Sequence, residues 1–554
     1  MASLISSLVW VRRGVSLQHP VKYDLDEKEL QRISALAKIE LEDARTELER
    51  ANKAADAMER GSDHEEDWED EKSDGVEEEV ENGIEDKMDE DPTPPLEKAD
   101  LNDLSEYKLD EYDKEEIGAL KPKKLFKAEL IRLQNRACSV ISRVDVEERD
   151  ELEVLPTDNL IVTAKTEDEI SHLEIYVYEE NEENLYIHHD IMLPSFPLCL
   201  EWLDFHPNNG NLDASSNPTG SYIAVGTMEP EIEIWSLDTL EAMYPTAILG
   251  RPDLTKAHTP LTLGSGKKKR KKTKSRAVST AYHVDAVLGL SWNKSHRNLL
   301  ASASADTTIK LWDLTRMATT ESSNDSQGSL RSFEVHKDKV QCVKWNDKEP
   351  SVLLSGSYDR TVRTFDTRAP EKGLVALLGA DVEGVCWDPW ETHNFFVSLE
   401  NGLVLNYDAR TLSSDSNTLA RSRFTLSAHD GAVSALDINP HIRGCMVTGG
   451  TDKLVKIWNI TEGDASKTEV SLITSRDLGV GRVFSAVWSP DDPLTVAAAG
   501  STARLQVWDI AANAGVRKAL SNKFSQASIT VKERSNGGII GVISDGEDDS
   551  GDDD

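Results

Sequence analysis

The chain has 554 residues and a formal net charge of −38 at pH 7, so it can bury a large core and still carry tails. This excess of negative charge argues against attachment of the whole chain to nucleic acid by electrostatics alone. Five cysteines without Cys-x-x-Cys spacing indicate buried, reduced thiols of a cytosolic or nuclear protein. The sequence predicts neither a signal peptide nor a membrane span.

The first predicted element is a strand within residues 1–15. Residues 5–10 read Ile-Ser-Ser-Leu-Val-Trp, an apolar-x-x-apolar-x-Trp pattern that recurs along the chain as the inner strand of a repeat. The first repeat lacks such a strand immediately before Leu160. We therefore expect residues 1–15 to return to that repeat and close a ring of repeats. The alternative is a loose terminus with one exposed Trp.

Residues 24–61 predict a helix. Asp24 or Asp26 can cap its start, and Gly61 can end it. A helix with so narrow and alanine-rich an apolar stripe would lie on the ring, on a partner, or in solvent. The stripe consists of Leu30, Ile33, Ala37, Leu41, Ala44, Leu48, Ala51 and Ala55.

Residues 62–158 form an acidic linker that is predicted to be disordered. Residues 63–91 alone contain 17 acidic residues and two lysines. Such a segment has too few apolar side chains to fold alone. The linker either solvates the chain or binds basic proteins such as histones or ribosomal proteins. Within it, residues 121–143 are basic and apolar, and they fit either a short partner-binding helix or a segment foreign to the linker.

Residues 159–533 predict an all-β, seven-bladed propeller of the WD40 type. Residues 299–314 (LLASASADTTIKLWDL) read as two antiparallel strands joined by a tight turn, and similar hairpins recur. Ten of the 12 Trp residues, Trp10 included, fall at repeat positions, which marks them as core residues rather than a cofactor site. The hairpins end at Tyr178, Trp235, Trp312, Phe365, Tyr407, Trp458 and Trp508.

A basic loop insert at residues 250–281 interrupts the propeller between the second and third blades. It fits a nuclear localisation signal or a contact with RNA phosphates, or else a solvated loop. No aromatic residues lie among its basic residues, which argues against base stacking. The basic side chains are Lys267, Lys268, Lys269, Arg270, Lys271, Lys272, Lys274 and Arg276.

The repeat pattern fades after Ile510. Either 516–520 or 527–531 is expected to supply an outer strand, and residues 534–554 an acidic, disordered tail. Ser544 and Ser550 precede acidic residues and are candidate phosphorylation sites, where phosphate would add negative charge.

A buried polar relay is predicted inside several blades: a His before the inner strand, Ser or Thr in the second strand, Asp in the next turn and Trp in the third strand. The grouping repeats by blade and lacks a Gly-x-Ser-x-Gly elbow, so it predicts blade packing rather than a hydrolase triad. His188-His189 has no matching ligand pair, and we expect neither metal, cofactor nor catalytic activity. Complete sets are His283, Ser302, Asp306 and Trp312, and His429, Thr448, Asp452 and Trp458; His336, Ser355 and Asp359 form a set in which Phe365 replaces the Trp.

Arg368 and Arg410 end two tetrapeptides, Phe-Asp-Thr-Arg and Tyr-Asp-Ala-Arg. These resemble the Trp-Asp-x-Arg box of propellers that serve as substrate receptors of cullin–RING ubiquitin ligases, with the Trp replaced in both. They are candidate residues for docking the ligase adaptor.

Longer strings resemble one family, that of periodic tryptophan protein 1, a eukaryotic WD-repeat protein. The strings are SLVWVRRGV, LEWLDFHP, YIAVGTMEPEIEIWSLD, HVDAVLGLSWNKSHRNLLASASADTTIKLWD and SGSYDRTVRTFDTR, while residues 121–143 depart from the family pattern. The resemblance implies a nuclear, largely nucleolar protein that acts in ribosome biogenesis, with links to chromatin at rRNA genes.

The sequence therefore predicts a non-enzymatic scaffold, a monomer within larger complexes and without membrane contact. Its expected partners are pre-ribosomal or nucleolar proteins, histones, and RNA through the basic loop. The alternatives are a substrate receptor of a cullin–RING ligase and a histone-binding chromatin factor.

Overall fold

The computed structural model describes residues 3–23, 152–207, 219–250, 278–316, 328–415, 420–462, 468–527, 529, 531 and 536–542. These residues belong to one compact unit, built from residues 1–23 and 146–554. Several predicted features lie outside the described residues: the helix at 24–61, the linker up to residue 151 with its basic segment 121–143, the basic side chains at 267–276, Ser544 and Ser550.

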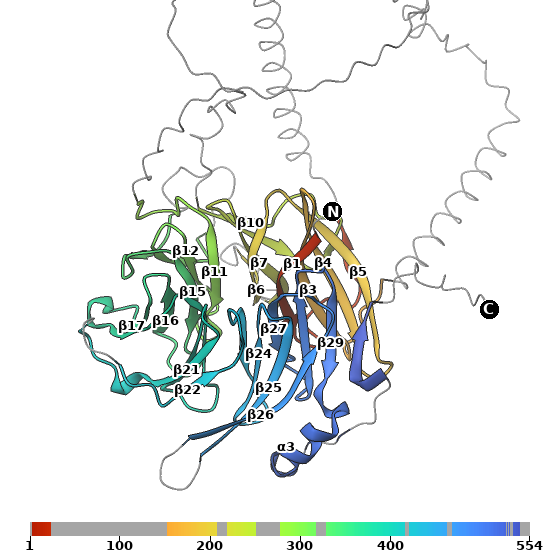
Figure 1. The fold of residues 1–554 in the computed structure, drawn as a ribbon. Coiled ribbons are helices and arrows are strands. Elements are labelled where there is room, and N and C mark those ends of the chain that lie inside the picture. The colour runs from red at the N-terminus through yellow and green to blue at the C-terminus, as the bar shows by residue number, and fades with distance from the viewer. Residues whose placement is uncertain are drawn as a thin grey trace, which may run out of the picture. The chain divides into compact units, whose positions relative to one another are not determined.

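The described chain folds into seven antiparallel sheets of four strands, each of which is one blade of a closed propeller (Figure 1). The first strands of neighbouring blades pack on one another around the centre. The first blade contains β1 (Ser3–Val11), β3 (Asn159–Glu167), β4 (Ile170–Glu179) and β5 (Asn184–Leu193). The second contains β6 (Pro197–Phe205), β7 (Thr219–Thr227), β8 (Ile232–Ser236) and β10 (Ala247–Leu249).

The remaining blades follow the chain without interruption. Blade three contains β11 (Val287–Trp292), β12 (Leu299–Ser304), β13 (Ile309–Asp313) and β14 (Arg331–Phe333). Blade four contains β15 (Val340–Trp345), β16 (Val352–Ser357), β17 (Thr361–Asp366) and β18 (Leu374–Leu377). Blade five contains β19 (Val382–Trp387), β20 (Asn394–Leu399), β21 (Leu403–Asp408) and β22 (Phe424–Ser427).

Blade six contains β23 (Ala435–Ile438), β24 (Cys445–Gly449), β25 (Leu454–Glu462) and β26 (Thr468–Asp477). Blade seven contains β27 (Val483–Trp488), β28 (Thr495–Gly500), β29 (Leu505–Asp509) and β30 (Ile539–Gly541). A short parallel pair joins β2 (Val21–Lys22) to β9 (Thr239–Leu240). Within the described residues, the helical elements are α3 (Ala514–Gln526) and the short turns η4 (Pro370–Lys372), η5 (Ala409–Thr411), η6 (Ile510–Ala512) and η7 (Asn536–Gly538).

Antiparallel pairing gives the propeller two faces. Turns between the second and third strands, and the loops that enter each inner strand, emerge on one face, which we call the relay face; it carries His283 and Asp306. Loops from the first to the second strand and from the third to the fourth emerge on the opposite face, which we call the base face. It carries the loops 388–393 and 439–444.

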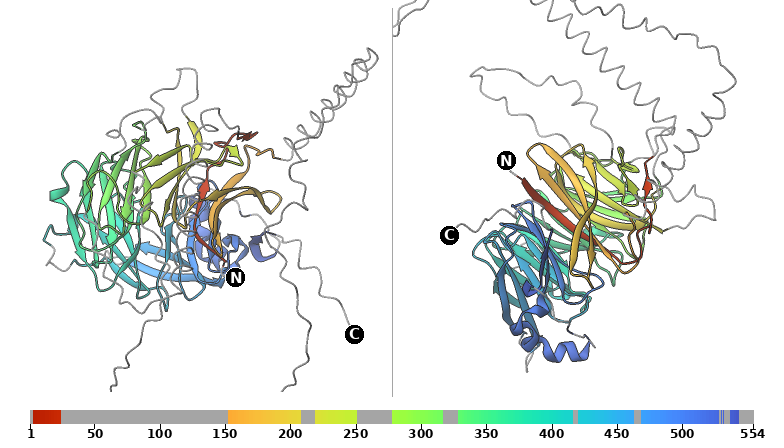
Figure 2. Two further views of the ribbon diagram at one scale, coloured as in Figure 1. Left: turned by 90° about the horizontal axis from the view of Figure 1, so that it is seen from above. Right: turned by 90° about the vertical axis from the view of Figure 1, so that its right-hand side faces the viewer.

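The ring closes between β1 and blade seven. β1 pairs in an antiparallel register with β3, so that Leu8 lies opposite Thr163, and Figure 2 shows it in red between the orange strands of blade one and the blue strands of blade seven. Of its four buried side chains, Ile5, Leu8 and Trp10 belong to a cluster that also contains residues of blade seven, and Val11 packs within blades one and two. The Trp10 indole N–H donates to the carbonyl oxygen of Val487 at 3.2 Å. The join therefore combines apolar packing with a hydrogen bond.

The prediction of an outer strand at 516–520 is wrong, because these residues lie in helix α3. Val516, Leu520 and Phe524 recur every four residues and are buried, which is the spacing of a helix face. The Asn513 side chain caps the helix by accepting the backbone N–H of Gly515 at 2.8 Å.

The outer strand of blade seven is instead β30, which pairs with β29. It lies inside residues 534–554, which were expected to form only a disordered tail, so the start of that predicted tail is also wrong. Its run of two isoleucines is too short to show a period, and only the open edge of β29 defines it as a strand.

None of the helices in the described part of the chain has the length and apolar character of a membrane-spanning helix.

Deletion of residues 1–15 should lower the melting temperature markedly, by about 5 °C or more, because it removes three large buried side chains and uncovers the inner edge of β3. Thermal unfolding of the purified protein, followed by circular dichroism, would measure this shift. Deletion of residues 545–554 serves as a terminal control and should leave the melt unchanged. An unchanged melt for the first variant would show that β1 does not hold the ring closed.

Candidate interaction sites

The polar relay of blade three is a continuous chain of hydrogen bonds. The Trp312 indole N–H donates to Ser302 Oγ at 2.8 Å, and that hydroxyl lies 2.7 Å from His283 Nε2. On the other side of the ring, His283 Nδ1 lies 2.9 Å from Asp306 Oδ2. A neutral imidazole with its proton on Nδ1 satisfies all of these groups in series. The relay thus ties the second and third strands to the loop that enters the inner strand.

Burial and hydrogen bonding set the charges in this relay. Burial lowers the pKa of His283, although the carboxylate beside it works in the opposite direction. Burial alone would raise the pKa of Asp306, but hydrogen bonds from His283, Thr308 and the backbone N–H of Val284 outweigh it and hold that pKa below its usual range. The pair is therefore a neutral imidazole that donates to a carboxylate, and it is oriented for structure rather than for proton transfer to a substrate.

Blade six contains the same four-membered relay. The Trp458 indole N–H donates to Thr448 Oγ1 at 2.9 Å, and this hydroxyl lies 2.8 Å from His429 Nε2. His429 Nδ1 lies 2.9 Å from Asp452 Oδ1. The threonine hydroxyl takes the place of the serine without a change in connectivity.

Blade four has a shortened relay. His336 lies 2.8 Å from Ser355 Oγ and 3.1 Å from Asp359 Oδ2. Phe365 fills the indole position and contacts Phe333 in a tilted arrangement, with ring centroids 5.3 Å apart. An apolar ring contact thus replaces one hydrogen bond.

Blades five and seven have an apolar residue at the serine position of the relay. By strand register, Val397 and Ala498 occupy the position of Ser302. Both are fully buried. In blade seven the indole N–H of Trp508 has no hydrogen-bond partner among the described residues. A buried N–H without an acceptor costs free energy, so blade seven carries a local defect that blade three avoids.

Charged residues of the inner strands link neighbouring blades. Glu201 Oε1 accepts the backbone N–H of Trp292 at 3.0 Å, and Asp437 Oδ2 accepts that of Trp488 at 2.9 Å. Lys344 Nζ of blade four lies 3.5 Å from Glu201 Oε2 of blade two, so this ion pair reaches past blade three. Burial raises the pKa of Asp437 to about 6. These charges therefore serve the joints between blades.

Arg368 and Arg410 lie on the base face, each just after a third strand. Arg368 Nη2 lies 2.7 Å from Asp366 Oδ2, and Arg410 Nη2 lies 2.6 Å from Asp408 Oδ2. The side chains are 77% and 67% exposed, respectively. Both guanidinium groups are thus accessible to a partner while each is held against the Asp of its own tetrapeptide.

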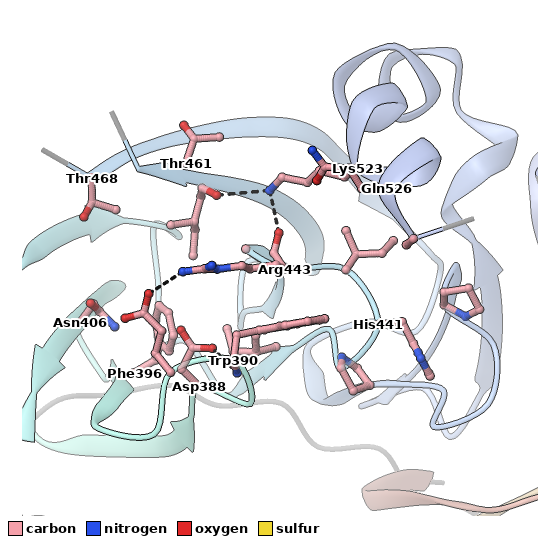
Figure 3. A pocket seen from close by; sticks show the side chains of 18 of the residues that line it. Asp388, Trp390, Phe396, Asn406, His441, Arg443, Thr461, Thr468, Lys523 and Gln526 are labelled. Atoms are coloured by element: carbon pink, nitrogen blue, oxygen red, sulfur yellow. Dashed lines mark hydrogen bonds and ion pairs between the residues drawn. The ribbon is translucent and has the colours of Figure 1, made fainter. Parts of the chain in front are cut away.

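A pocket of about 810 Å³ opens on the base face between blades five and six, beside helix α3 (Figure 3). Trp390, Phe396 and Phe424 supply aromatic surface. Arg443 Nη2 lies 2.8 Å from Glu391 Oε1 within it. The pocket therefore combines apolar walls with charged groups, as ligand sites do.

Local turn geometry places Arg443 in this pocket. After β23, Asn439 Oδ1 accepts the backbone N–H groups of His441 and Ile442, at 2.8 and 2.7 Å, and turns the chain. Gly444 then adopts a φ of +69°, and a Cβ there would clash with the carbonyl oxygen of Ile460. These two turns fix the loop from which Arg443 projects into the pocket.

The sequence analysis did not identify this pocket, because its walls come from loops and a helix that are distant in the chain. One signal was present: Trp390 is one of the two Trp residues outside the repeat positions. A Trp that the repeat does not explain is a candidate for a surface role. The structure leaves the relay residues, the two exposed arginines and the pocket in separate places.

Comparisons with known proteins agree with the fold. The model of the WD domain, G-beta repeat, matches residues 277–313, 327–366 and 420–459. A WD repeat-containing protein of Schizosaccharomyces pombe is 41% identical over 96% of this chain and 93% of its own length. Periodic tryptophan protein 1 of Saccharomyces cerevisiae is 34% identical over 96% and 92%, and its Drosophila melanogaster homolog is 30% identical over 68% and 72%.

The relay geometry predicts opposite effects for two substitutions. Ser302→Ala should lower the free energy of unfolding by about 1–3 kcal/mol, because it leaves the Trp312 N–H without its acceptor. Ala498→Ser should raise it by about 1 kcal/mol, because the new hydroxyl can accept the Trp508 N–H. Urea denaturation would measure both changes.

Ala497→Ser is the matched control, since Ala497 is also buried in β28 but belongs to the apolar cluster at the ring closure. It should be destabilising. Equal effects of the two serine substitutions would contradict the assignment of the relay position in blade seven.

Proposed function

Because the chain belongs to the periodic tryptophan protein 1 family of WD-repeat proteins, we propose that it is a non-enzymatic scaffold for ribosome assembly in the nucleolus. The near full-length similarity to periodic tryptophan protein 1 is the observation that supports this function most directly. The ribosomal and nucleolar parts of the proposal rest on the family resemblance described in the sequence analysis.

The structure supports a binding role in two ways. A closed propeller presents two faces and a rim on one rigid body, so that several proteins can bind it at once. The His, Ser and Asp groupings face one another inside blades, where they complete hydrogen bonds rather than activate a nucleophile. Among the described residues, no group of three or more His, Cys, Asp or Glu side chains is placed to hold a metal.

Charge supports the choice of partners. A chain with a net charge of −38 repels free nucleic acid but attracts basic proteins, and ribosomal proteins and histones are basic. The local exception is the basic group at 267–276, which would serve nuclear import or a contact with RNA phosphates. Acidic and basic segments in one chain suit a scaffold that handles RNA–protein particles.

Capture of the tagged, full-length protein from nuclear extract, with and without RNase, tests this function. We expect mass spectrometry to identify pre-ribosomal factors and ribosomal proteins. Loss of these proteins after RNase would show that RNA bridges them, whereas their retention would show direct protein contacts. Recovery of the cullin adaptor in near-stoichiometric amounts, without nucleolar proteins, would contradict the proposal.

The exposed Arg368 and Arg410 keep the ubiquitin-ligase receptor as the second candidate function. The Arg368→Ala, Arg410→Ala double variant separates the two: it should abolish adaptor capture in a ligase receptor and leave nucleolar retention intact in an assembly scaffold. Arg316→Ala is a matched control, because Arg316 also follows a third strand and is 66% exposed.

A histone-binding form of the scaffold would use the acidic linker. Deletion of residues 62–116 should then remove histone capture while the pre-ribosomal proteins remain.

A further inference from the structure

We propose that the pocket between blades five and six binds an extended peptide in which an acidic residue lies next to a large apolar residue. This inference rests on the proposed scaffold function, and it names a binding site and the class of partner segment that fits it. Three features of the described residues support it: a fixed aromatic wall, an exposed guanidinium, and a wall supplied by helix α3.

Trp390 provides the aromatic wall. Its side chain is 42% exposed, a large share for the largest apolar side chain. The indole is nevertheless held in place, because its N–H donates to the carbonyl oxygen of Asn439 at 3.1 Å. Phe396 and Phe424 line the pocket behind it. A fixed, exposed indole offers contact area to an apolar side chain at little cost in conformational entropy.

The cationic groups of the pocket are the reason why we expect an acidic residue in the bound peptide. Arg423, Arg443 and Lys523 line the pocket with two carboxylates, those of Asp388 and Glu391. Both carboxylates are engaged within the protein: Glu391 lies 2.8 Å from Arg443 and 3.4 Å from Arg423, and Asp388 accepts the backbone N–H of Trp390 at 2.9 Å. The most exposed charge is therefore a guanidinium.

Arg443 is the charged group of the pocket that is most accessible to a partner. Its side chain is 61% exposed, against 30% for Glu391, and Figure 3 shows it reaching across the middle of the pocket above Trp390. A guanidinium carries five N–H donors in a fork that matches a carboxylate. In a chain with a net charge of −38, a pocket with a cationic excess favours a negatively charged partner locally.

Helix α3 completes the pocket as a fixed wall. Lys523 Nζ donates to the carbonyl oxygens of Arg443 and Ile460, at 2.7 and 3.2 Å, and to Asn459 Oδ1 at 2.6 Å. These bonds join the helix to blade six, and Figure 3 shows two of them as dashed lines from Lys523. The pocket is thus formed before a partner arrives, and its volume of about 810 Å³ accommodates several peptide side chains.

An array of synthetic hexapeptides, probed with the purified full-length protein, tests the proposal. Each peptide fixes Asp, Glu or Lys beside Phe, Leu or Trp, with the other positions varied. We expect retention of the peptides that pair an acidic residue with an apolar one, and weak or no retention of the lysine series. Trp390→Ser should weaken binding of the selected peptides about tenfold, through loss of the indole surface.

Reversal of one charge is the sharpest test. Arg443→Glu should shift the preference from the acidic to the lysine peptides, and Arg443→Ala should weaken acidic peptides about tenfold without creating that shift. Arg316→Glu is the matched control, because it changes an arginine of similar exposure on the same face and should leave the profile unchanged. Thermal melts would confirm that the variants are folded.

Three results would overturn the proposal: no selective peptide, a profile that Arg443→Glu leaves unchanged, or equal retention of acidic and lysine peptides. Binding that appears only after deletion of residues 543–554 would assign the pocket to the chain's own acidic tail, and would also overturn it. Because the array contains no nuclear material, any of these outcomes leaves the capture of pre-ribosomal proteins as a separate test of the scaffold function.

Discussion

Closure of the ring without a shared strand is the constraint on which the rest of the structure depends. Blade one takes its inner strand from β1, and blade seven completes itself with β30, so in the described chain neither sheet lends a strand to the other. The joint must therefore come from packing and a few polar contacts. Asp491 of blade seven makes two of the polar contacts to blade one, since Oδ2 accepts the backbone N–H of Arg13 at 2.9 Å and the Asn159 amide at 2.7 Å.

The blades of the closed ring differ in the residues at their relay positions. Blades three and six are held together internally by the full relay, whereas blade five has an apolar residue at the serine position. The pocket forms where this blade meets blade six and helix α3. Differences of this kind between blades allow a repeated fold to carry a binding site at a single place.

The repeat itself could be predicted from the sequence, because its period and its aromatic residues are determined by local strand and turn chemistry. In all three relays the Asp lies four residues after the Ser or Thr and the Trp or Phe lies ten residues after it, and such spacings are visible without a structure. The outer strand of blade seven was not predictable in this way. Val516 and Leu520 looked like strand residues until their burial every four residues was known, and Ile539–Gly541 is a strand only because β29 offers an open edge.

The pocket lay beyond prediction for a related reason. Arg443, Trp390 and Lys523 come from a turn, another turn and a helix, and nothing in their sequence neighbourhoods refers to the other two. Their proximity is set by the angle between two blades, a property of the assembled ring. Residues of the repeat can be recognised because they recur in the sequence. The residues of the pocket do not follow the repeat pattern.

The separation between β1 and its partners also fixes an order of events during synthesis. Trp10 leaves the ribosome first, yet the carbonyl oxygen that accepts its indole N–H belongs to a residue 477 positions later. At about 5–20 residues per second, that interval lasts roughly half a minute to a minute and a half. During that interval the nascent chain therefore carries an apolar strand without its neighbours from blade seven, and the synthesis of blade seven decides when the packing of blade one is complete.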